Sequence, residues 1–361
     1  MKRTNNGDPL EKVIQSVLPP DSEAMRQAAK RWDSIAKPLR SLGAFENMIT
    51  QIAGIQRSVS VALEKRTLVV FCSDNGIVEE GVTQTGQDVT AVVASNLAHG
   101  RATAALFCRR TGTDILPVDV GMITDVGIRT EKAAYGTKNF AKTDAMTRAQ
   151  AIKTIGTGAA IARELADAGN RILMTGEMGI GNTSTSSAVA AVLLGRPVEE
   201  ITGRGAGLSD EGLRHKREVL SRAVRDRNPD PSDPLDVLAK TGGFDIAAMA
   251  GLMIGAASCK IPVILDGFIS AVAALTAVRM CPQVFGYLIP SHQSSEPGAN
   301  IVLEALGLRA PLHADMRPGE GCGAVMMIPL LELAADIYTK MPTFEEIEIE
   351  AYQSFDEEVT E

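Results

Sequence analysis

Cysteine and histidine are scarce in this chain of 361 residues, and neither is placed in a recognisable pattern. The five cysteines are an odd number without C-x-x-C spacing, which argues against a disulfide framework and against a zinc site. The four histidines have no ligand spacing, so we expect no metal. This cysteine usage favours a protein of the reducing cytoplasm.

Long apolar runs are also missing. The N-terminus, MKRTNNGDP, lacks the apolar core of a signal peptide. The most apolar stretch, residues 261–278, is interrupted by Asp266 and falls short of a membrane span. We therefore expect no secretory leader and no membrane partner.

Aromatic residues are few, at 4%, and basic residues do not cluster. The formal net charge is −8, and residues 342–361 carry eight acidic side chains and no Lys or Arg. The rest of the chain is therefore near neutral. Because a nucleic-acid-binding face needs clustered basic residues, this argues against nucleic acid as the main partner.

Most of the chain alternates between two patterns. Short apolar runs that end in polar or glycine residues occur at 67–76, 113–121, 171–182, 261–267 and 285–292. Helical, alanine-rich stretches follow at 89–110, 148–168, 184–194, 211–227, 246–258, 298–306 and 324–340. This alternation predicts an α/β protein with a parallel sheet, which binds its ligand at the carboxyl ends of the strands.

The first 64 residues have a different pattern. Asp21 and Ser22 can cap a helix that runs to about Ala36, and a second helix follows Leu42 and Gly43. No strand pattern is present there. We predict a small helical region over 1–64 beside a large α/β domain over 65–324.

The segment 176–183, GEMGIGNT, joins a predicted strand to a predicted helix. It matches G-x-x-x-x-G-K-[ST] except that Asn182 replaces the lysine, which favours a single phosphate over a nucleoside triphosphate. A second glycine loop, 203–207, precedes a helix that Ser209 can cap and that carries Lys216 as a candidate cation. The alternatives are a tight turn without ligand and a flexible connector.

The segment 317–323, RPGEGCG, places Glu320 between glycines that allow a ligand to approach the backbone closely. Such a carboxylate can act as a base in a dry pocket, or it can be an exposed loop residue. Arg317 can hold a phosphate or carboxylate, or form a surface salt bridge.

Other strand ends carry polar side chains as well. Glu177 would repel a phosphate at contact distance, so we expect it to face a cationic or hydroxylic part of the ligand. Asp74 and Asp266 can bind ribose hydroxyls or cap the next turn. His292 suggests a hydrolytic triad, but the chain has no G-x-S-x-G elbow.

Taken together and in order, several segments resemble the nicotinate-nucleotide–dimethylbenzimidazole phosphoribosyltransferase family over about residues 35–344. They are KPLRSLGAFE (37–46), SDNGIVEEGVT (73–83), GEMGIGNTSTSS (176–187), GRGAGLSDEGLRHK (203–216), GGFDIAAMAGLMIGAA (242–257), PVILDGFISAVAAL (262–275), PSHQSSEPG (290–298) and DMRPGEGCGA (315–324). The resemblance implies transfer of phosphoribose from nicotinate mononucleotide to 5,6-dimethylbenzimidazole without a cofactor. It also implies a Rossmann-like sheet, a homodimer, and a small helical domain in which about 325–361 completes 1–64.

The resemblance assigns roles residue by residue. Glu320 takes the position of the general base, and Glu177 that of the second functional glutamate. The residues implied to line the substrate site are Gly179, Gly181, Asn182 and Thr183 in the phosphate-side loop, Gly205, Lys216, Asp266, Ser294 and Arg317 around the nucleotide, and Thr83 near the base pocket. Asn75 departs from the family's Asp-His-Gly, and this departure, with Ala91, leaves the identity of the incoming base open.

The implied chemistry suits these residues. Nicotinate leaves a pyridinium glycoside as a neutral ring, so departure needs neither an acid nor a metal. The attacking imidazole loses a proton, which Glu320 can accept, and attack from the opposite face inverts the anomeric carbon. Two alternatives stay open: a transferase of the same fold that uses adenine or a phenol, and a non-catalytic nucleotide-binding subunit. The missing G-x-G-x-x-G fingerprint argues against an NAD-dependent oxidoreductase.

Overall fold

The strands form one parallel sheet in the order β3-β2-β1-β4-β5-β6 in the computed structural model, which describes residues 9–352. The strands are β1 Arg66–Ser73, β2 Asp114–Gly121, β3 Arg129–Thr130, β4 Ile172–Met178, β5 Val263–Leu265 and β6 Leu288–Pro290. The strand order changes direction between β1 and β4, and this is the point where open α/β sheets bind ligands. The predicted α/β class and parallel sheet are confirmed.

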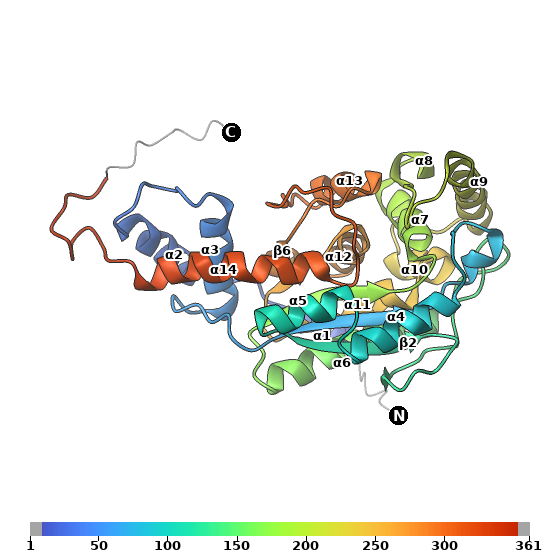
Figure 1. Ribbon diagram of the computed structural model, residues 1–361, viewed down its shortest axis with the longest axis horizontal. Coiled ribbons are helices and arrows are strands. Elements are labelled where there is room, and N and C mark those ends of the chain that lie inside the picture. The colour runs from blue at the N-terminus through green and yellow to red at the C-terminus, as the bar shows by residue number, and fades with distance from the viewer. Residues whose placement is uncertain (1–8, 353–361) are drawn as a thin grey trace, which may run out of the picture.

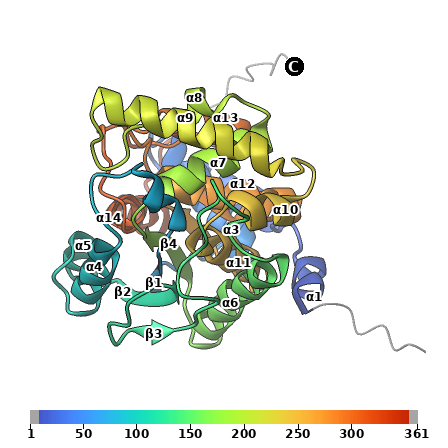
Figure 2. The same ribbon diagram turned by 90° about the vertical axis from the view of Figure 1, so that its right-hand side faces the viewer.

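Both faces of the sheet are buried. Successive strand residues point to opposite faces, and each face packs into its own hydrophobic core. In β1, Leu68 and Val70 join one core, and Val69 and Phe71 join the other. Figure 2 shows the sheet between α4 and α5 on one side and α6 and α11 on the other.

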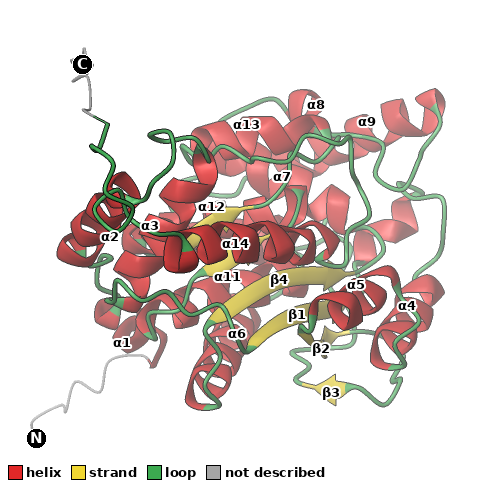
Figure 3. Ribbon diagram, turned by 60° about the vertical axis from the view of Figure 1, so that its left-hand side comes forward, coloured by secondary structure: helices red, strands yellow, loops and turns green. Residues whose placement is uncertain are grey.

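The first face is covered by α3 Ala44–Gln56, α4 Asp88–Ala98, α5 Thr103–Thr111 and α14 Cys322–Lys340, of which Figure 3 shows α14, α5 and α4 in front of the strands. The second face is covered by α1 Pro9–Ser16, α6 Arg148–Asp167, α7 Asn182–Leu194, α10 Pro234–Thr241, α11 Phe244–Ser258 and α12 Phe268–Met280. The helices α8 Val198–Ile201, α9 Asp210–Arg227 and α13 Pro297–Ala305 pack on α7 and α12. Two 3-10 helices, η1 Gly76–Glu80 and η2 Pro282–Tyr287, precede α4 and β6.

The terminal helices divide between the two faces. The structure packs α2, Ser22–Ser34, with α3 and the end of α14 (Figure 1), where the rings of Trp32 and Tyr338 lie 4.9 Å apart. In contrast, α1 packs against α6 and α11. A separate small domain stays a prediction, and residues 353–361 of its predicted C-terminal part lie outside the described residues.

Several local expectations are confirmed, and others are wrong. Asp21 and Ser209 cap α2 and α9 as predicted. The single helix expected over 89–110 is wrong, because Gly100 takes a left-handed φ of +72° and separates α4 from α5. The sequence analysis also missed α10, although Asp233 caps it and Pro234 occupies its first turn.

Within the described residues, α14 is the one helix long and apolar enough to cross a membrane. Half of that apolar window is buried inside the protein, where it packs on β4, β5 and α5.

Two glycines of α6 allow a direct test of the close packing between α6 and α11. A β-carbon added at Gly158 would lie 2.0 Å from the carbonyl oxygen of Ala248, whereas one added at Gly156 meets no atom within 4 Å. We expect Gly158→Ala to lower the free energy of unfolding by about 1–3 kcal/mol through overpacking. Gly156→Ala should raise it by about 0.4–1 kcal/mol, because alanine restricts the unfolded chain. Denaturant unfolding measures both, and equal effects at the two positions would contradict the close helix contact.

Candidate active site

Two adjoining cavities lie at the carboxyl ends of β4, β5 and β6. The larger has a volume of about 290 Å³ and the smaller about 70 Å³. Gly179, Asn182, Thr183 and Gly205 line both, so the turn between β4 and α7 forms their common wall.

The structure brings most of the predicted residues to the larger cavity. Its lining includes Glu177, Gly179, Asn182, Thr183, Gly205, Asp266, Ser294, Arg317 and Glu320. The other three, Thr83, Gly181 and Lys216, line the smaller cavity. Thr83 therefore lies with Lys216 rather than beside Glu320, and its hydroxyl donates a hydrogen bond to the carbonyl of Thr85 at 2.8 Å.

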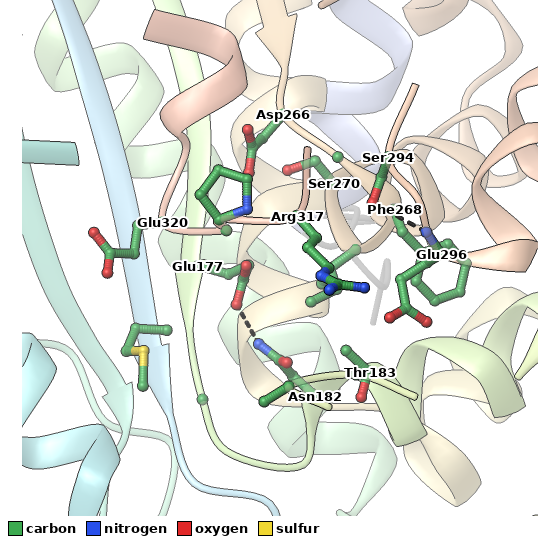
Figure 4. Close-up of a pocket in the computed structure, with 18 of the residues that line it drawn as sticks. Glu177, Asn182, Thr183, Asp266, Phe268, Ser270, Ser294, Glu296, Arg317 and Glu320 are labelled. Carbon is green, nitrogen blue, oxygen red and sulfur yellow. Dashed lines mark hydrogen bonds between the residues drawn. The ribbon is translucent and has the colours of Figure 1, made fainter. Parts of the chain in front are cut away.

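Glu177, near the end of β4, is buried beside the turn that carries Gly319. Its carboxylate accepts a hydrogen bond from the side-chain amide of Asn182, and Figure 4 shows it facing Arg317 across the cavity. Burial raises the pKa of Glu177 well above its usual value, and the nearby carboxylates of Asp245 and Asp266 raise that pKa further. Gly319 lies beside it with a left-handed φ of +68°, which favours glycine, and a β-carbon there would lie 3.1 Å from the Glu177 carboxylate.

Glu320 is half-buried and has an unusual backbone conformation. Its φ is +60°, and both flanking glycines also have positive φ. One carboxylate oxygen accepts a hydrogen bond from the backbone N–H of Ala104, in the first turn of α5, at 3.1 Å. Burial raises the pKa of Glu320, and the hydrogen bond from Ala104 acts in the opposite direction. Figure 4 shows the side chain directed away from Arg317.

Asp266 directly follows β5, and its carboxylate accepts hydrogen bonds from the backbone at the start of α14. One carboxylate oxygen accepts from the N–H of Gly321 at 3.2 Å, and the other accepts from the N–H of Gly323 at 2.7 Å. The Nδ1 atom of His292, which also lines the cavity, lies 4.0 Å from Asp266. Burial raises the pKa of Asp266, which His292 and the backbone donors lower.

The opposite end of the site is cationic. Lys216, on α9, is only 1% exposed and donates a hydrogen bond to the Thr183 hydroxyl at 2.9 Å. Burial lowers the pKa of Lys216 to about 8. The guanidinium of Arg317 projects into the larger cavity (Figure 4). This end, beside the N-terminus of α7, suits a phosphate.

Sequence analysis missed Asp245, a fully buried residue in the first turn of α11. Burial raises its pKa to about 6, and its charge raises the pKa of Glu177. Asp245 follows two glycines, Gly242 and Gly243, and lies at the start of an apolar helix, a local pattern that carries no clear signal for a functional carboxylate. Phe268, which lines the larger cavity directly after Asp266 and Gly267, was missed too.

Asn75 acts on the loop rather than on the cavities. Its amide donates to the carbonyl of Ile180 at 3.2 Å, and neither Asn75 nor Ala91 lines either cavity. In residues 9–352, no group of three or more His, Cys, Asp or Glu is arranged to hold a metal ion.

Comparison with known proteins defines the class first. A family model described as phosphoribosyltransferase matches residues 17–349, so the protein is a transferase of this class. Two relatives, from Acetivibrio thermocellus and Ruminiclostridium cellulolyticum, are 46% and 44% identical over 95% of this chain and 99% of their own. Both are nicotinate-nucleotide–dimethylbenzimidazole phosphoribosyltransferases, and the chain belongs to their family.

A solved structure shows the same fold. The crystal structure of CobT from Thermus thermophilus matches with a TM-score of 0.86 and 37% identity. The match covers 91% of this chain and 100% of that one.

The buried Lys216 predicts a pH-dependent anion affinity. With a pKa of about 8, its amine is mostly charged below pH 8 and loses its proton as the pH rises. Sulfate keeps its charge over this range, so we expect its affinity to weaken up to about tenfold per pH unit above 8. Titration calorimetry at pH 7–10 measures this, with Lys216→Met as the control that removes the dependence. An unchanged affinity across this range would rule out Lys216 as the anion's partner.

Proposed function

We propose that the protein transfers the 5-phosphoribosyl group of nicotinate mononucleotide to 5,6-dimethylbenzimidazole. The products are α-ribazole 5′-phosphate and nicotinate. The observation that carries the proposal is a pair of adjoining cavities, with buried carboxylates in the lining of the larger and Lys216 in the lining of the smaller, in a chain of this family. Such a site matches a ligand with a phosphate at one end and a reacting glycosidic bond at the other.

The phosphate binds at the cationic end. Lys216 and Arg317 supply positive charge, and Thr183 supplies a hydroxyl. Gly179, Gly181 and Gly205 contribute backbone to the cavity walls. Asn182 begins α7, whose N-terminus favours an anion. Ser294 is buried in the wall of the larger cavity and completes the predicted nucleotide site.

Glu320 acts as the general base. As the imidazole nitrogen bonds to the anomeric carbon, the second ring nitrogen becomes acidic and releases its proton to this carboxylate. Because burial raises its pKa, Glu320 is a stronger base than an exposed glutamate. Nicotinate departs as a neutral ring from the opposite face, so the anomeric carbon is inverted.

Glu177 faces the ribose and the pyridinium ring. A positive ring close to Glu177 favours its ionised form, which opposes the pKa increase caused by burial. The ionised carboxylate then stabilises the positive charge that develops on the ribose as the glycosidic bond breaks. Asn182 holds the side chain in this orientation by its hydrogen bond.

The role of Glu320 is tested by Glu320→Gln, which keeps the size of the side chain and removes the base. We expect kcat for nicotinate release to fall by about 10²–10⁴-fold. The affinity for nicotinate mononucleotide should change little, because Glu320 lies away from the cationic end. Chromatography measures the nicotinate released in parallel reactions with dimethylbenzimidazole, adenine and phenol, and the comparison also identifies the acceptor. A near-normal rate in this variant would remove the assignment.

We also propose a cytoplasmic homodimer. All five cysteines are free, which suits a reducing compartment. On α14, Met326, Leu330, Leu333 and Ile337 form an apolar stripe with spacings of four, three and four residues. Met326 and Leu333 are 38% and 64% exposed, and Leu330 and Ile337 are half-buried against the core. This spacing is typical of a helix that packs on another helix, and a two-fold axis would bring the stripe against its own copy.

The stripe predicts the response of the oligomer to a charge. We expect Leu333→Glu to convert the dimer to a monomer, because a carboxylate would be buried in the apolar contact. Leu18→Glu is the matched control, since Leu18 is 50% exposed but lies outside the stripe. Light scattering coupled to size-exclusion chromatography gives the mass. A dimer that survives Leu333→Glu would place the interface elsewhere.

A further inference from the structure

The turn that carries Glu320 is held from two directions. On one side it presses against β4, where a β-carbon added at Gly176 would lie 2.5 Å from the carbonyl oxygen of Glu320. On the other side, Asp266 accepts hydrogen bonds from Gly321 and Gly323, which follow Glu320 directly. The backbone of Glu320 therefore has little freedom to shift.

Asp266 completes the N-terminus of α14, which has no cap of its own. The residue at the cap position is Gly321, which has no side chain to accept from the first turn. Asp266 supplies the missing acceptor from a position 55 residues earlier in the chain. Gly323 makes the approach possible, because a β-carbon there would lie 2.0 Å from Nδ1 of His292 and 2.9 Å from Asp266.

Both carboxylate oxygens of Asp266 are occupied by these backbone donors, and the side chain is 5% exposed. Both of these hydrogen bonds go to the segment that directly follows Glu320. The same carboxylate sets the path of the chain at residues 321–323. Its contacts thus fit a role in shaping the turn better than a role as a ligand of the sugar.

We propose that Asp266 is a positioning residue, which aims the Glu320 carboxylate at the acceptor base by fixing the backbone of residues 321–323. This inference rests on the proposed function, because it assumes that Glu320 accepts the proton. Asp266 acts through Glu320 and makes no bond to the reacting atoms.

The charge of Asp266 gives the role a second readout. The groups that set the pKa of Glu320 are its burial, the N–H groups of Thr103 and Ala104 on α5, and Asp266. Among them, Asp266 is the charged side chain, and it raises that pKa. Removing its charge should therefore shift the acidic limb of kcat/KM to lower pH. Loss of a sugar contact alone would not move this limb.

The test is a double-mutant cycle of Asp266→Asn and Glu320→Gln, assayed by nicotinate release. Asp266→Asn turns an acceptor into a donor that faces a backbone N–H, so the turn shifts. We expect kcat to fall about 10²-fold, as for a small displacement of a reacting group, with an unchanged KM for nicotinate mononucleotide. The double variant should be no slower than Glu320→Gln alone.

The outcomes separate the possible roles. A raised KM with normal kcat, or an unmoved acidic limb, would overturn the inference. Additive losses in the double variant would also overturn it, because a sugar contact or an effect through Glu177 would persist without Glu320. If Asp266→Asn does not fold by circular dichroism, Asp266→Ser, whose hydroxyl can accept one of the two bonds, enters the same cycle. A wild-type protein that releases no nicotinate would overturn the proposed function itself, whereas additivity with an active wild type overturns only the role of Asp266.

Discussion

Two helix N-termini without caps of their own organise this site. The first turns of α5 and α14 have no local side chain to accept their N–H groups, and each receives a carboxylate from a distant part of the chain. Glu320 serves α5 and Asp266 serves α14, so one short turn joins both helices to the edge of the sheet. Carboxylates at helix N-termini are favoured by the helix dipole. The hydrogen bonds that join these helices to the turn therefore also set the direction of the Glu320 side chain, which is proposed as the base.

Three buried acidic residues of the site lie close together, whereas the buried Lys216 lies on another element, where Glu296 is the carboxylate that acts on it. Glu177, Asp245 and Asp266 gather at the ends of β4 and β5 and the start of α11, and burial raises the pKa of each. The buried Lys216 lies at the other end, on α9, and burial lowers its pKa. A ligand with an anionic group near Lys216 and a positive ring near the carboxylates would favour the charged forms of both. A phosphorylated nucleoside with a pyridinium base has these two features.

Local patterns in the sequence predict much of this arrangement. The common edge of Glu177, Asp266 and His292 is predictable because parallel strands end at one edge, and the caps Asp21 and Ser209 are predictable from adjacent residues. What could not be foreseen depends on distant contacts. Nothing near Asp266 indicates that its partners lie at 321 and 323, and nothing on α9 indicates that Lys216 is buried. The two-residue β3 has too little pattern to be read at all. The roles assigned to the site residues stay predictions.

At Glu320 the left-handed backbone favours glycine, whereas the proposed reaction needs a carboxylate. Glycine would relax the strained φ, and asparagine would tolerate it, yet both delete the acid. Aspartate keeps the acid but is one methylene shorter, so its carboxylate would not reach the N–H of Ala104 as Glu320 does. A more stable backbone and an active carboxylate are therefore alternatives at this position, because the residue that relaxes the turn removes the acid.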